Sequence, residues 1–481
     1  MFGTVINKIC IIFLLCVFSC DSLEVENLAQ PIKEQVLLTP DDYRSTLDGA
    51  AYQWFNALFK PEPLLTFLVA ADVGTSSWGF HGMREVGTVK EPYGLGAHFP
   101  IDNSVTAAYP EFLEIPYNGL YSCATSANDI IKAVSTLKID QETINQYNAY
   151  AFFLRALGFG YLGLLFDQAL IYDENTDLET LTYEDFVPYT QVIDHALKDF
   201  DTALDYAKKT KSIQINGFNG ITINKEQLIK LINGYYAKMM VHSARTVAET
   251  NAIDWHQVLE KINDGNLDFD FIALGNGDRW YNAHLRSHNP DLVRVDQKIV
   301  HMVNPQSPYP YPENGYPSDQ NIIPTLDARW GSSKDHMYRY AGAAPFRANR
   351  GLYFFSTWKF NEHESFRLAG GIGPMPLYKS TEARLFKAEA HIRLGIDIEQ
   401  AASIINQTRV VKGKKEPAKA TDPDLLDKLF YERYLETIDA IANGFFDRRR
   451  TDDLGLKQFL HFPVPARNLQ TWGAEIYTTG G

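Results

Sequence analysis

Apolar residues recur at three- and four-residue steps over much of the chain, which is the spacing of an amphipathic helix. The pattern is clearest over 183–209, where Thr182 and Asp185 approximate a capping box. Asn224 and Gln227 open the pattern over 225–249 in the same way. The same spacing predicts further helices over 39–59, 109–138, 145–166 and 253–264.

The helical pattern returns in the last quarter of the chain. It predicts helices over 381–394, 398–411 and about 423–443. Gly395 and Gly444 follow the first and third of these, and glycine commonly ends a helix. Asp397 and Gln400 are placed to cap the second.

Two segments lack the helical pattern and are rich in Gly, Pro, Asn and aromatic residues, namely 73–108 and 265–379. Because a structureless loop of the second length is improbable in a compact domain, we expect short strands and long surface loops there. Such loops commonly carry function. The predicted fold is mainly α: a tetratricopeptide-like helical-repeat frame with irregular, loop-rich insertions containing short strands. The frame is expected over 40–72, 109–264 and 380–444 of a single domain spanning 40–481.

The first residues have the features of a secretory signal. One basic residue, Lys8, precedes an apolar run that is too short to cross a bilayer as a helix. Cys20 follows Ser19, and with Val17 this resembles a bacterial lipobox, whose cysteine is acylated before cleavage. We therefore expect a signal peptide over 1–19, a lipid anchor on Cys20 and an acidic tether over 20–39. The alternatives are a signal cut elsewhere or a buried free cysteine.

The net charge limits the kinds of binding partner that we expect, and the cysteine content limits the disulfides. The chain carries a net charge of −14, and loss of Lys8 with the signal leaves about −15. Nucleic acid is therefore not an expected partner, because its binding depends on cationic contacts to phosphate. Membrane attachment is expected to come from the lipid. The mature chain keeps only Cys20 and Cys123, so a disulfide scaffold is not expected, and Cys123 is interpreted as a small buried apolar residue.

Three stretches resemble the SusD/RagB family of Bacteroidetes outer-membrane lipoproteins. The first, over 148–172, has Arg155 and Ala156 on a helix that runs into a Leu-Phe-Asp turn. The second, over 382–409, carries an Ala-Glu-Ala helix ended by glycine and a following helix with an Ile-Asn pair. The third, over 425–450, resembles the family's Glu-Arg helix followed by Gly and Phe-Asp. The occurrence of these three stretches in this order, behind a lipoprotein signal, points to the family more specifically than any single stretch does.

The sequence departs from the family pattern at two of these stretches. No glycine separates Phe166 from Asp167. Phe445 and Phe446 stand where the family usually has an arginine before Asp447, which puts one internal ion pair in doubt. Each stretch can also be interpreted as ordinary helix packing, with small residues where two helices cross and charge pairs near the end of a helix.

The resemblance implies an outer-membrane lipoprotein that faces the cell exterior and captures a nutrient, usually an oligosaccharide. It also implies a SusC-type TonB-dependent transporter as partner, no cofactor and no enzymatic activity. The alternatives are a structural lid or peptide-binding partner of such a transporter, and a surface glycosidase. The sequence contains none of the common hydrolase or phosphate-loop motifs, although it leaves open a carboxylate pair for glycoside cleavage.

Sugar capture requires flat aromatic faces flanked by amide, carboxylate and guanidinium groups. Such residues gather in the irregular segments, whereas Trp54 and Trp255 lie on predicted helices and are interpreted as packing residues. The candidate ligand-binding residues are Trp78, Arg279, Trp280, Tyr281, Asn282, Tyr309, Tyr311 and Trp330.

One stretch has the spacing of a calcium loop. Asp173, Asn175, Asp177 and Glu184 occupy its first, third, fifth and twelfth positions. Leu178 stands at the sixth position, where such a loop requires glycine, and Glu184 is equally explained as a first-turn acid of the next helix. Calcium binding is therefore one of two interpretations of this stretch, beside the start of a helix.

Overall fold

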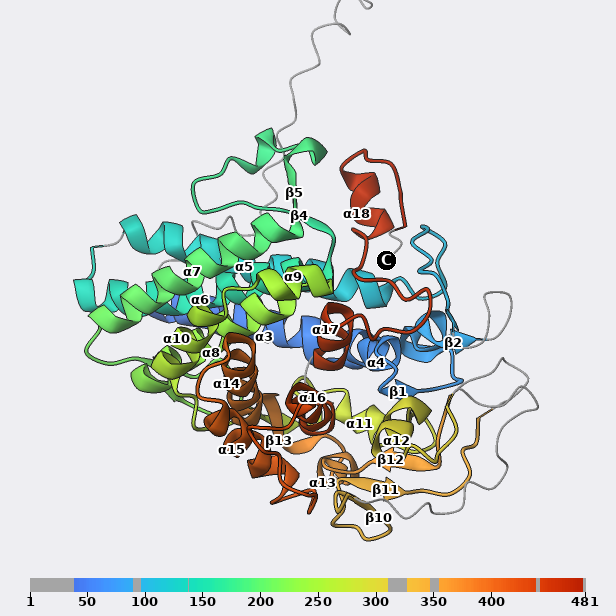
Figure 1. The fold of residues 1–481 in the computed structure, drawn as a ribbon. Coiled ribbons are helices and arrows are strands. Elements are labelled where there is room, and N and C mark those ends of the chain that lie inside the picture. The colour runs from blue at the N-terminus through green and yellow to red at the C-terminus, as the bar shows by residue number, and fades with distance from the viewer. Residues whose placement is uncertain are drawn as a thin grey trace, which may run out of the picture. The chain divides into compact units, whose positions relative to one another are not determined.

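The computed structural model describes residues 39–89, 97–136, 138–309, 327–346, 354–437 and 442–478 (Figure 1). The chain divides into two units, 1–43 and 44–481. The predicted signal peptide, Cys20, nearly all of the tether and Tyr311 lie outside the described residues. Within the described ranges, no helix is long and apolar enough to cross a membrane.

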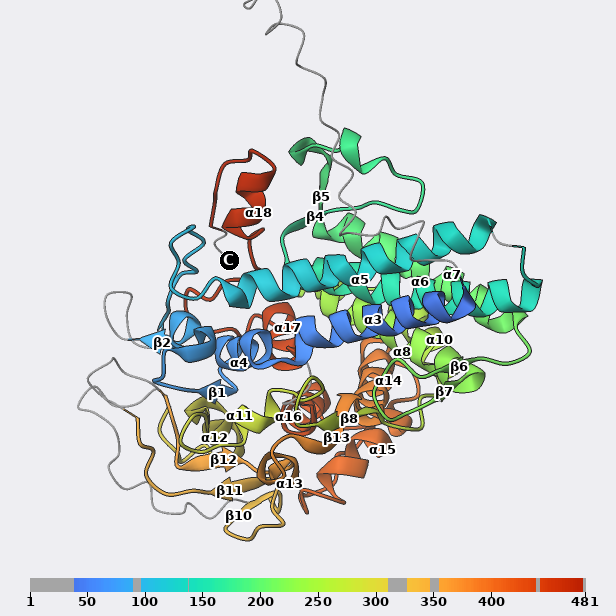
Figure 2. The same cartoon turned by 180° about the vertical axis from the view of Figure 1, so that it is seen from behind.

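Long helices dominate the structure and confirm the mainly α prediction. They run side by side in both views of the ribbon (Figures 1 and 2). Their order along the chain is α3 (Pro40–Phe59), α4 (Pro61–Ala70), α5 (Glu111–Thr136), α6 (Gln141–Leu165), α7 (Tyr189–Lys209), α8 (Lys225–Ser243), α9 (Val247–Ala252) and α10 (Trp255–Gly265).

Helix α6 is the centre of this frame, between α5 and α7. Every residue from 147 to 165 is buried, as expected of a helix that is apolar on all sides. A Cβ atom at Gly158 would lie 3.0 Å from the carbonyl oxygen of Leu120 on α5. Glycine at this position therefore allows the two helices to approach closely.

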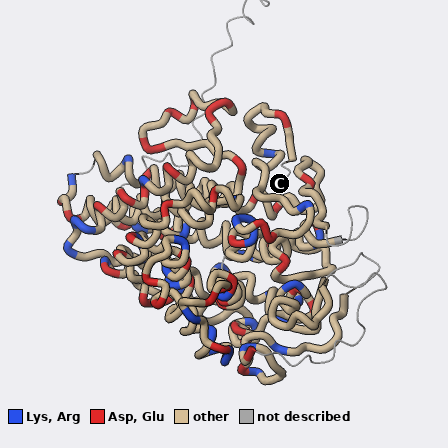
Figure 3. The backbone as a smooth tube through the Cα atoms, viewed as in Figure 1, with Lys and Arg blue, Asp and Glu red and all other residues tan. Residues whose placement is uncertain are grey.

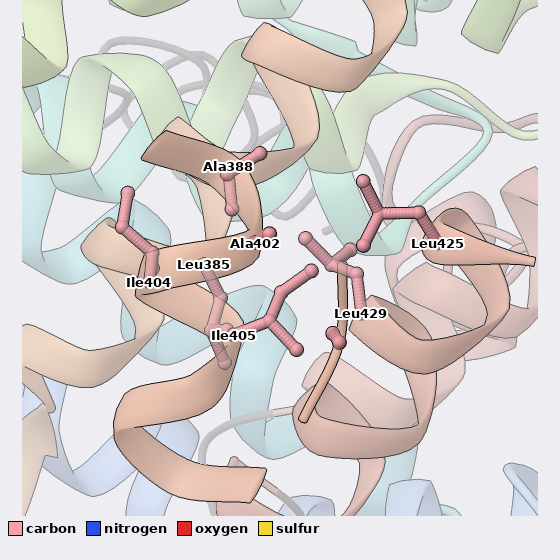
Figure 4. Close-up of a cluster of buried hydrophobic side chains, with 9 residues drawn as sticks. Leu385, Ala388, Ala402, Ile404, Ile405, Leu425 and Leu429 are labelled. Carbon is pink, nitrogen blue, oxygen red and sulfur yellow. The ribbon is translucent and has the colours of Figure 1, made fainter. Parts of the chain in front are cut away.

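A second group of helices packs around its own apolar cluster. It consists of α14 (Ser380–Leu394), α15 (Ile398–Arg409) and α16 (Leu425–Glu436). Two further helices, α17 (Asn443–Arg450) and α18 (Ala466–Thr471), follow along the chain outside this cluster. Leu385, Ile405 and Leu429 point toward one another from the first three helices, and each is at most 1% exposed (Figure 4).

The strands are short and scattered, as expected for the irregular segments. The longest pair is β8 (Phe271–Asn276) with β13 (Ile372–Tyr378), which are antiparallel with Ile372 opposite Asn276. Strands β10 (Trp330–Gly331), β11 (Tyr338–Tyr340) and β12 (Trp358–Phe360) form one sheet in that order. The other pairs are β1 (Gly74–Thr75) with β9 (Arg294–Val295), β2 (Thr88–Val89) with β3 (Ala97–His98), β4 (Gln168–Leu170) with β5 (Phe186–Pro188), and β6 (Gln214–Ile215) with β7 (Ile223–Asn224).

Short helical turns interrupt these irregular segments. They are α11 (His284–Ser287), α12 (Gln297–Val303) and α13 (Glu364–Leu368), with single 3₁₀ turns η1 (Phe80–Gly82), η2 (Arg84–Val86), η3 (Leu178–Thr180) and η4 (Tyr183–Asp185).

Several predicted helix boundaries are wrong. The capping box at Thr182 and Asp185 exists, but it caps the 3₁₀ turn η4, and α7 begins only at Tyr189 because strand β5 intervenes. The predicted helix over 225–249 is two helices, since the backbone of Ala244 is extended between α8 and α9. Asn224 does cap α8 together with Gln227, as predicted.

Of the three predicted helix boundaries in the C-terminal part of the chain, one is correct and two are wrong. Gly395 ends α14 with a left-handed φ of 67°, as expected. The side chain of Asp397 makes no capping hydrogen bond to α15, since its own backbone is left-handed. Gly444 does not close a helix but lies inside α17, where a Cβ atom would approach Cγ2 of Val73 to 2.8 Å.

The stretches that carry the family resemblance supply buried ion pairs to the frame. Arg155 of α6 binds Asp199 of α7 through two hydrogen bonds of 2.7 and 2.8 Å. Arg433 of α16 binds Asp447 of α17 at 2.7 Å and Glu389 of α14 at 3.1 Å. Asp447 therefore has an arginine partner, and the ion pair that Phe445 and Phe446 put in doubt is supplied from another helix.

Candidate functional site

Residues from two distant parts of the sequence meet at the start of α4. The ammonium of Lys60, the residue before this helix, donates a hydrogen bond of 2.7 Å to the carbonyl oxygen of Arg279. The amide of Ala283 donates one of 2.8 Å to the carbonyl oxygen of Phe59. These two bonds hold the loop after β8 against the junction of α3 and α4. They place the predicted residues Arg279, Trp280 and Tyr281 beside that junction.

Aromatic rings pack closely at this meeting point. The ring centre of Trp280 lies 4.6 Å from that of Phe55 and 5.3 Å from that of Tyr52. The guanidinium of Arg279 lies 4.3 Å from the centre of the Tyr52 ring. The ammonium of Lys60 lies 3.5 Å from the centre of the Tyr281 ring. Tyr52, Trp280 and Tyr281 are each partly exposed, so rigidly held ring surface remains available to solvent.

The loop that presents these residues is fixed by its own side chain. The carboxamide oxygen of Asn276, at the end of β8, accepts hydrogen bonds from the backbone amides of Asp278 and Trp280 at 3.0 and 3.1 Å. The backbone amide of Asn276 donates in turn to the carbonyl oxygen of Trp280 at 2.7 Å. The ring of Trp280 is therefore positioned before any ligand binds.

Lys60 sits in an unusual electrostatic environment. It is 9% exposed, and burial lowers its pKa to about 8. Glu62 and Asp278 act in the opposite direction, while the positive charge of Arg279 lowers the pKa further. The ammonium is held by a carbonyl oxygen and a ring face instead of a carboxylate.

A second group of aromatic residues flanks the same helix start. Nδ1 of His81 lies 2.9 Å from a carboxylate oxygen of Glu62, and this hydrogen bond is the main reason that the pKa of Glu62 lies below its usual value. The ring of Phe80 contacts that of His81 with centres 4.9 Å apart, and Trp78 follows at 6.5 Å from Phe80. The indole nitrogen of Trp78 donates to the carbonyl oxygen of Asp291 at 2.8 Å.

The backbone of His81 is strained. Its φ of 56° lies in the left-handed region, which costs a residue with a side chain about 1 kcal/mol. The carbonyl oxygen of His81 accepts a hydrogen bond of 3.0 Å from the hydroxyl of Thr66, and its ring is held by Glu62. The surrounding structure thus imposes a defined orientation on this ring, and such strain is concentrated at functional sites in proteins.

We call the residues of these two groups, on either side of the start of α4, the aromatic strip. Lys60 and Glu62, two residues apart, connect its two halves, and their charges interact. The strip consists of Tyr52, Lys60, Glu62, Trp78, Phe80, His81, Arg279, Trp280 and Tyr281.

The remaining predicted residues lie elsewhere. Trp330 is 4% exposed, stacked on Tyr338 with ring centres 4.2 Å apart and covered by Trp358. Asn282 is fully buried. Tyr309 is partly buried against the ring of Phe354. Trp54 and Trp255 are buried helix residues, as predicted: 0% and 5% of their surface is exposed.

Sequence reasoning missed five members of the strip, namely Tyr52, Lys60, Glu62, Phe80 and His81. Tyr52 falls on a helix with ordinary amphipathic spacing, and Lys60 and Glu62 look like the common charged residues of a helix boundary. No local pattern marks them. Tyr52 and Lys60 contact residues more than 200 positions later, as in the bond between Lys60 and Arg279, while Glu62 and His81 contact each other across 19 positions.

The calcium loop has a different arrangement from the one that its spacing suggested. A carboxylate oxygen of Asp173 accepts hydrogen bonds from the amide of Asn175 and the hydroxyl of Thr176, both at 2.9 Å. A carboxylate oxygen of Asp177 accepts one from the amide of Glu179 at 3.1 Å. Among the described residues, which include this loop, no three His, Cys, Asp or Glu side chains are placed to hold a metal ion.

A small apolar cavity of about 20 Å³ lies on another side of α4. Its lining includes Leu65, Leu68, His284, His288 and Phe445. Space of this size holds about one water molecule. A sugar ring does not fit there, so the exposed strip is the better candidate for a ligand surface.

Comparison with known proteins identifies the fold. No family model matches this sequence, and no curated protein matches it. A solved SusD superfamily protein from Parabacteroides distasonis superimposes with a TM-score of 0.64 at 14% identity, covering 91% of this chain and 98% of that one. This chain has a SusD-like fold.

Two further solved structures share the SusD-like fold. The NanU protein of B. fragilis has a TM-score of 0.58 at 14% identity and covers 94% of this chain and 99% of its own. A SusD-like carbohydrate binding protein from Bacteroides fragilis has a TM-score of 0.59 at 12% identity, over 85% of this chain and 86% of that one. The resemblance expected from the three helical stretches is therefore confirmed at the level of the fold.

Proposed function

We propose that this protein is a cell-surface, lipid-anchored binding protein that captures a glycan and passes it to a SusC-type TonB-dependent transporter. The observation that carries the glycan part is the aromatic strip on a SusD-like fold. Solved proteins of this fold include one named as carbohydrate binding. The lipid anchor on Cys20 and the outer-membrane location rest on the lipobox resemblance.

The strip has the chemistry that sugar binding needs. The ring faces of Trp78, Trp280 and Tyr52 can stack on the C–H faces of pyranose rings. The strip also contains a carboxylate, an imidazole and a guanidinium, which are groups that sugar hydroxyls accept hydrogen bonds from and donate them to. Because the loop after β8 is fixed by Asn276, little ordering is required on binding.

The glycan proposal is tested by titration calorimetry and affinity electrophoresis against a panel of neutral and acidic polysaccharides. The protein is the mature chain with Cys20→Ala, which leaves the rest intact. Trp280→Ala and Trp78→Ala are each expected to weaken binding at least tenfold. Trp472→Ala is the matched control, because this partly exposed tryptophan packs on Phe186 of β5, outside the strip.

The possible outcomes separate the proposed function from its alternatives. Unchanged affinity in both strip variants would move the glycan site elsewhere on the protein. Absence of binding across the panel, combined with tight association with the co-purified transporter, would favour a structural lid or a peptide-binding partner. Release of reducing ends from a bound polysaccharide would identify a glycosidase, and we expect none.

The anchor and the transporter partner need separate measurements. Intact mass of the mature protein is expected to show a diacylglycerol-modified Cys20 at the N-terminus, and Cys20→Ala is expected to abolish membrane association. Gentle detergent extraction of the native membrane is expected to co-purify a TonB-dependent transporter. An unmodified N-terminus, or a chain cut elsewhere, would remove the anchor from the proposal.

A further inference from the structure

Two positively charged residues of the aromatic strip, Lys60 and Arg279, form no direct ion pair in the described part of the chain. Lys60 donates to the carbonyl oxygen of Arg279, so its ammonium lies next to the backbone of a second cationic residue. Within the described ranges, no carboxylate oxygen lies within ion-pair distance, 4.0 Å, of either side chain. The protein contains 59 acidic and 45 basic residues, so acidic partners are abundant elsewhere in the chain (Figure 3).

Several rigidly held arginines are paired with acids, whereas the buried Arg245, Arg294 and Arg449 donate to backbone carbonyl oxygens. Arg155 binds Asp199, Arg329 binds Asp327 and Glu432, and Arg450 binds Glu389. Arg279 is instead placed against a ring, with its guanidinium 4.3 Å from the centre of Tyr52. It is exposed, and its side-chain N–H groups donate to no acceptor in the described part of the chain.

The guanidinium carbon of Arg279 lies over the ring of Tyr52, and the N–H donors of a guanidinium point outward in the plane of the group. That geometry matches a carboxylate, which accepts two parallel hydrogen bonds from the guanidinium fork. The neighbouring Trp280 offers a ring face at the same place, with its centre 5.3 Å from that of Tyr52. A sugar stacked on Trp280 would therefore lie beside the Arg279 guanidinium, which can donate two parallel hydrogen bonds to a substituent on the sugar ring.

The charge of Lys60 responds to its surroundings. Burial lowers its pKa most, the charges of Glu62 and Asp278 raise it, and the charge of Arg279 lowers it by the smallest of these effects. An anion bound at Arg279 would raise the pKa of Lys60, because a negative charge stabilises the charged form of the amine.

We propose that the aromatic strip selects glycans that carry carboxylated sugars, with Trp280 stacking on the sugar ring and Arg279 binding its carboxylate. Lys60 is a positioning residue that holds the Arg279 backbone and adds positive potential. This inference rests on the proposed glycan-binding function, since it names the class of glycan that the same surface takes.

The test uses matched ligands that differ only in charge. Polygalacturonate, alginate, hyaluronan and polysialic acid are each compared by calorimetry with their carboxyl-reduced, neutral forms. At least one acidic polymer is expected to bind ten times more tightly than its reduced form, and the difference should shrink as salt is raised. Arg279→Gln is expected to remove this preference, so that the acidic and the reduced polymer bind with equal affinity. Arg467→Gln, on α18 and 59% exposed, is the control that should leave the preference unchanged.

A second measurement follows Lys60 directly. The amine is expected to titrate near pH 8 in the free protein, as observed by NMR of isotopically labelled lysine side chains, and to move to higher pH when the acidic polymer binds. A purely structural role of Arg279 would not produce this shift. Circular dichroism and thermal unfolding of Arg279→Gln show whether the variant is folded.

The outcomes distinguish the inference from the proposed function. If only neutral glycans bind, or acidic and reduced forms bind equally, the inference is overturned while glycan binding stands. An acidic preference that survives Arg279→Gln also overturns it. If no glycan of either kind binds, both the inference and the proposed function fail.

Discussion

Arg450 and Glu389 form a two-pronged ion pair in which neither side chain is exposed. Nη1 and Nη2 of the arginine each donate to one carboxylate oxygen at 2.7 Å. Both side chains are 0% exposed. The same carboxylate accepts from Arg433 at 3.1 Å, so Glu389 of α14 connects helices α16 and α17.

Loss of the Glu389 charge is expected to destabilise the protein strongly. Glu389→Gln removes one of the two buried carboxylates that Arg450 and Arg433 share, leaving Asp447 alone to neutralise both, and breaking a buried pair costs about 3–5 kcal/mol. Urea unfolding at pH 7 measures the change. Glu226→Gln is the control, since this carboxylate is 80% exposed, 3.5 Å from Lys230, and contributes at most about 1 kcal/mol. Equal stabilities of the two variants would contradict the prediction.

Stability is expected to fall as the pH drops below about 6.5. Burial lowers the pKa of His242 and of His461 to about 3, so both stay neutral in the folded protein while the unfolded chain binds protons from its ordinary pKa of 6.5 downward. Each histidine then contributes a slope that approaches about 1.4 kcal/mol per pH unit. Unfolding free energies at pH 7.0, 5.5 and 4.5 measure this slope, and His461→Gln should reduce it. A free energy that is flat or rises toward pH 4.5 would refute the prediction.

Cys123 is expected to be chemically inert in the folded protein. Its side chain is fully buried on α5, its thiol lies 3.5 Å from the carbonyl oxygen of Leu154, and burial raises its pKa. In the mature Cys20→Ala chain it is the remaining cysteine. A thiol-specific reagent at pH 8 should detect no thiol in the native protein and one in denaturant. Rapid labelling of the native protein would show that α5 opens locally.

The apolar cluster between α14, α15 and α16 is expected to depend on Leu429. Leu429→Ala removes a fully buried side chain and should cost about 2–5 kcal/mol, because the neighbouring leucine and isoleucine side chains cannot close the cavity completely. Leu368→Ala provides the comparison: this leucine is 70% exposed, and its loss should change stability by no more than about 0.5 kcal/mol. Thermal and urea unfolding of the two variants decide the question.

Much of the helical frame could be predicted from the sequence because helix formation is largely a local property. The spacing of apolar residues located α5, α6 and α10 within four residues of their ends. Gly395 ended α14 as expected. Where the predicted helix boundaries were wrong, a contact with residues distant in the sequence or in another element had set the boundary. The pairing of β4 with β5 shortened the start of α7, and the close approach of Val73 explains Gly444 inside α17.

Only part of the aromatic strip could be predicted from the sequence, because contacts with distant residues also decide which side chains belong to it. Arg279, Trp280 and Tyr281 could be selected because residue type and loop context suit sugar binding. Trp330 has the same type and context, yet the sheet of β10, β11 and β12 buries its ring. Whether an aromatic ring faces solvent is set by what packs on it, and this information is absent from its sequence neighbours.

Residue order was thus sufficient for the helical class, for most helix positions and for the resemblance to SusD-like proteins, since amphipathic spacing and capping involve residues within a few turns. The tertiary structure alone decided which residues form the aromatic strip and which acids neutralise which arginines. Lys60 meets Arg279 across 219 positions, and Arg329 meets Glu432 across 103. Such contacts depend on how the helices pack, a collective outcome of the whole chain that no local pattern encodes.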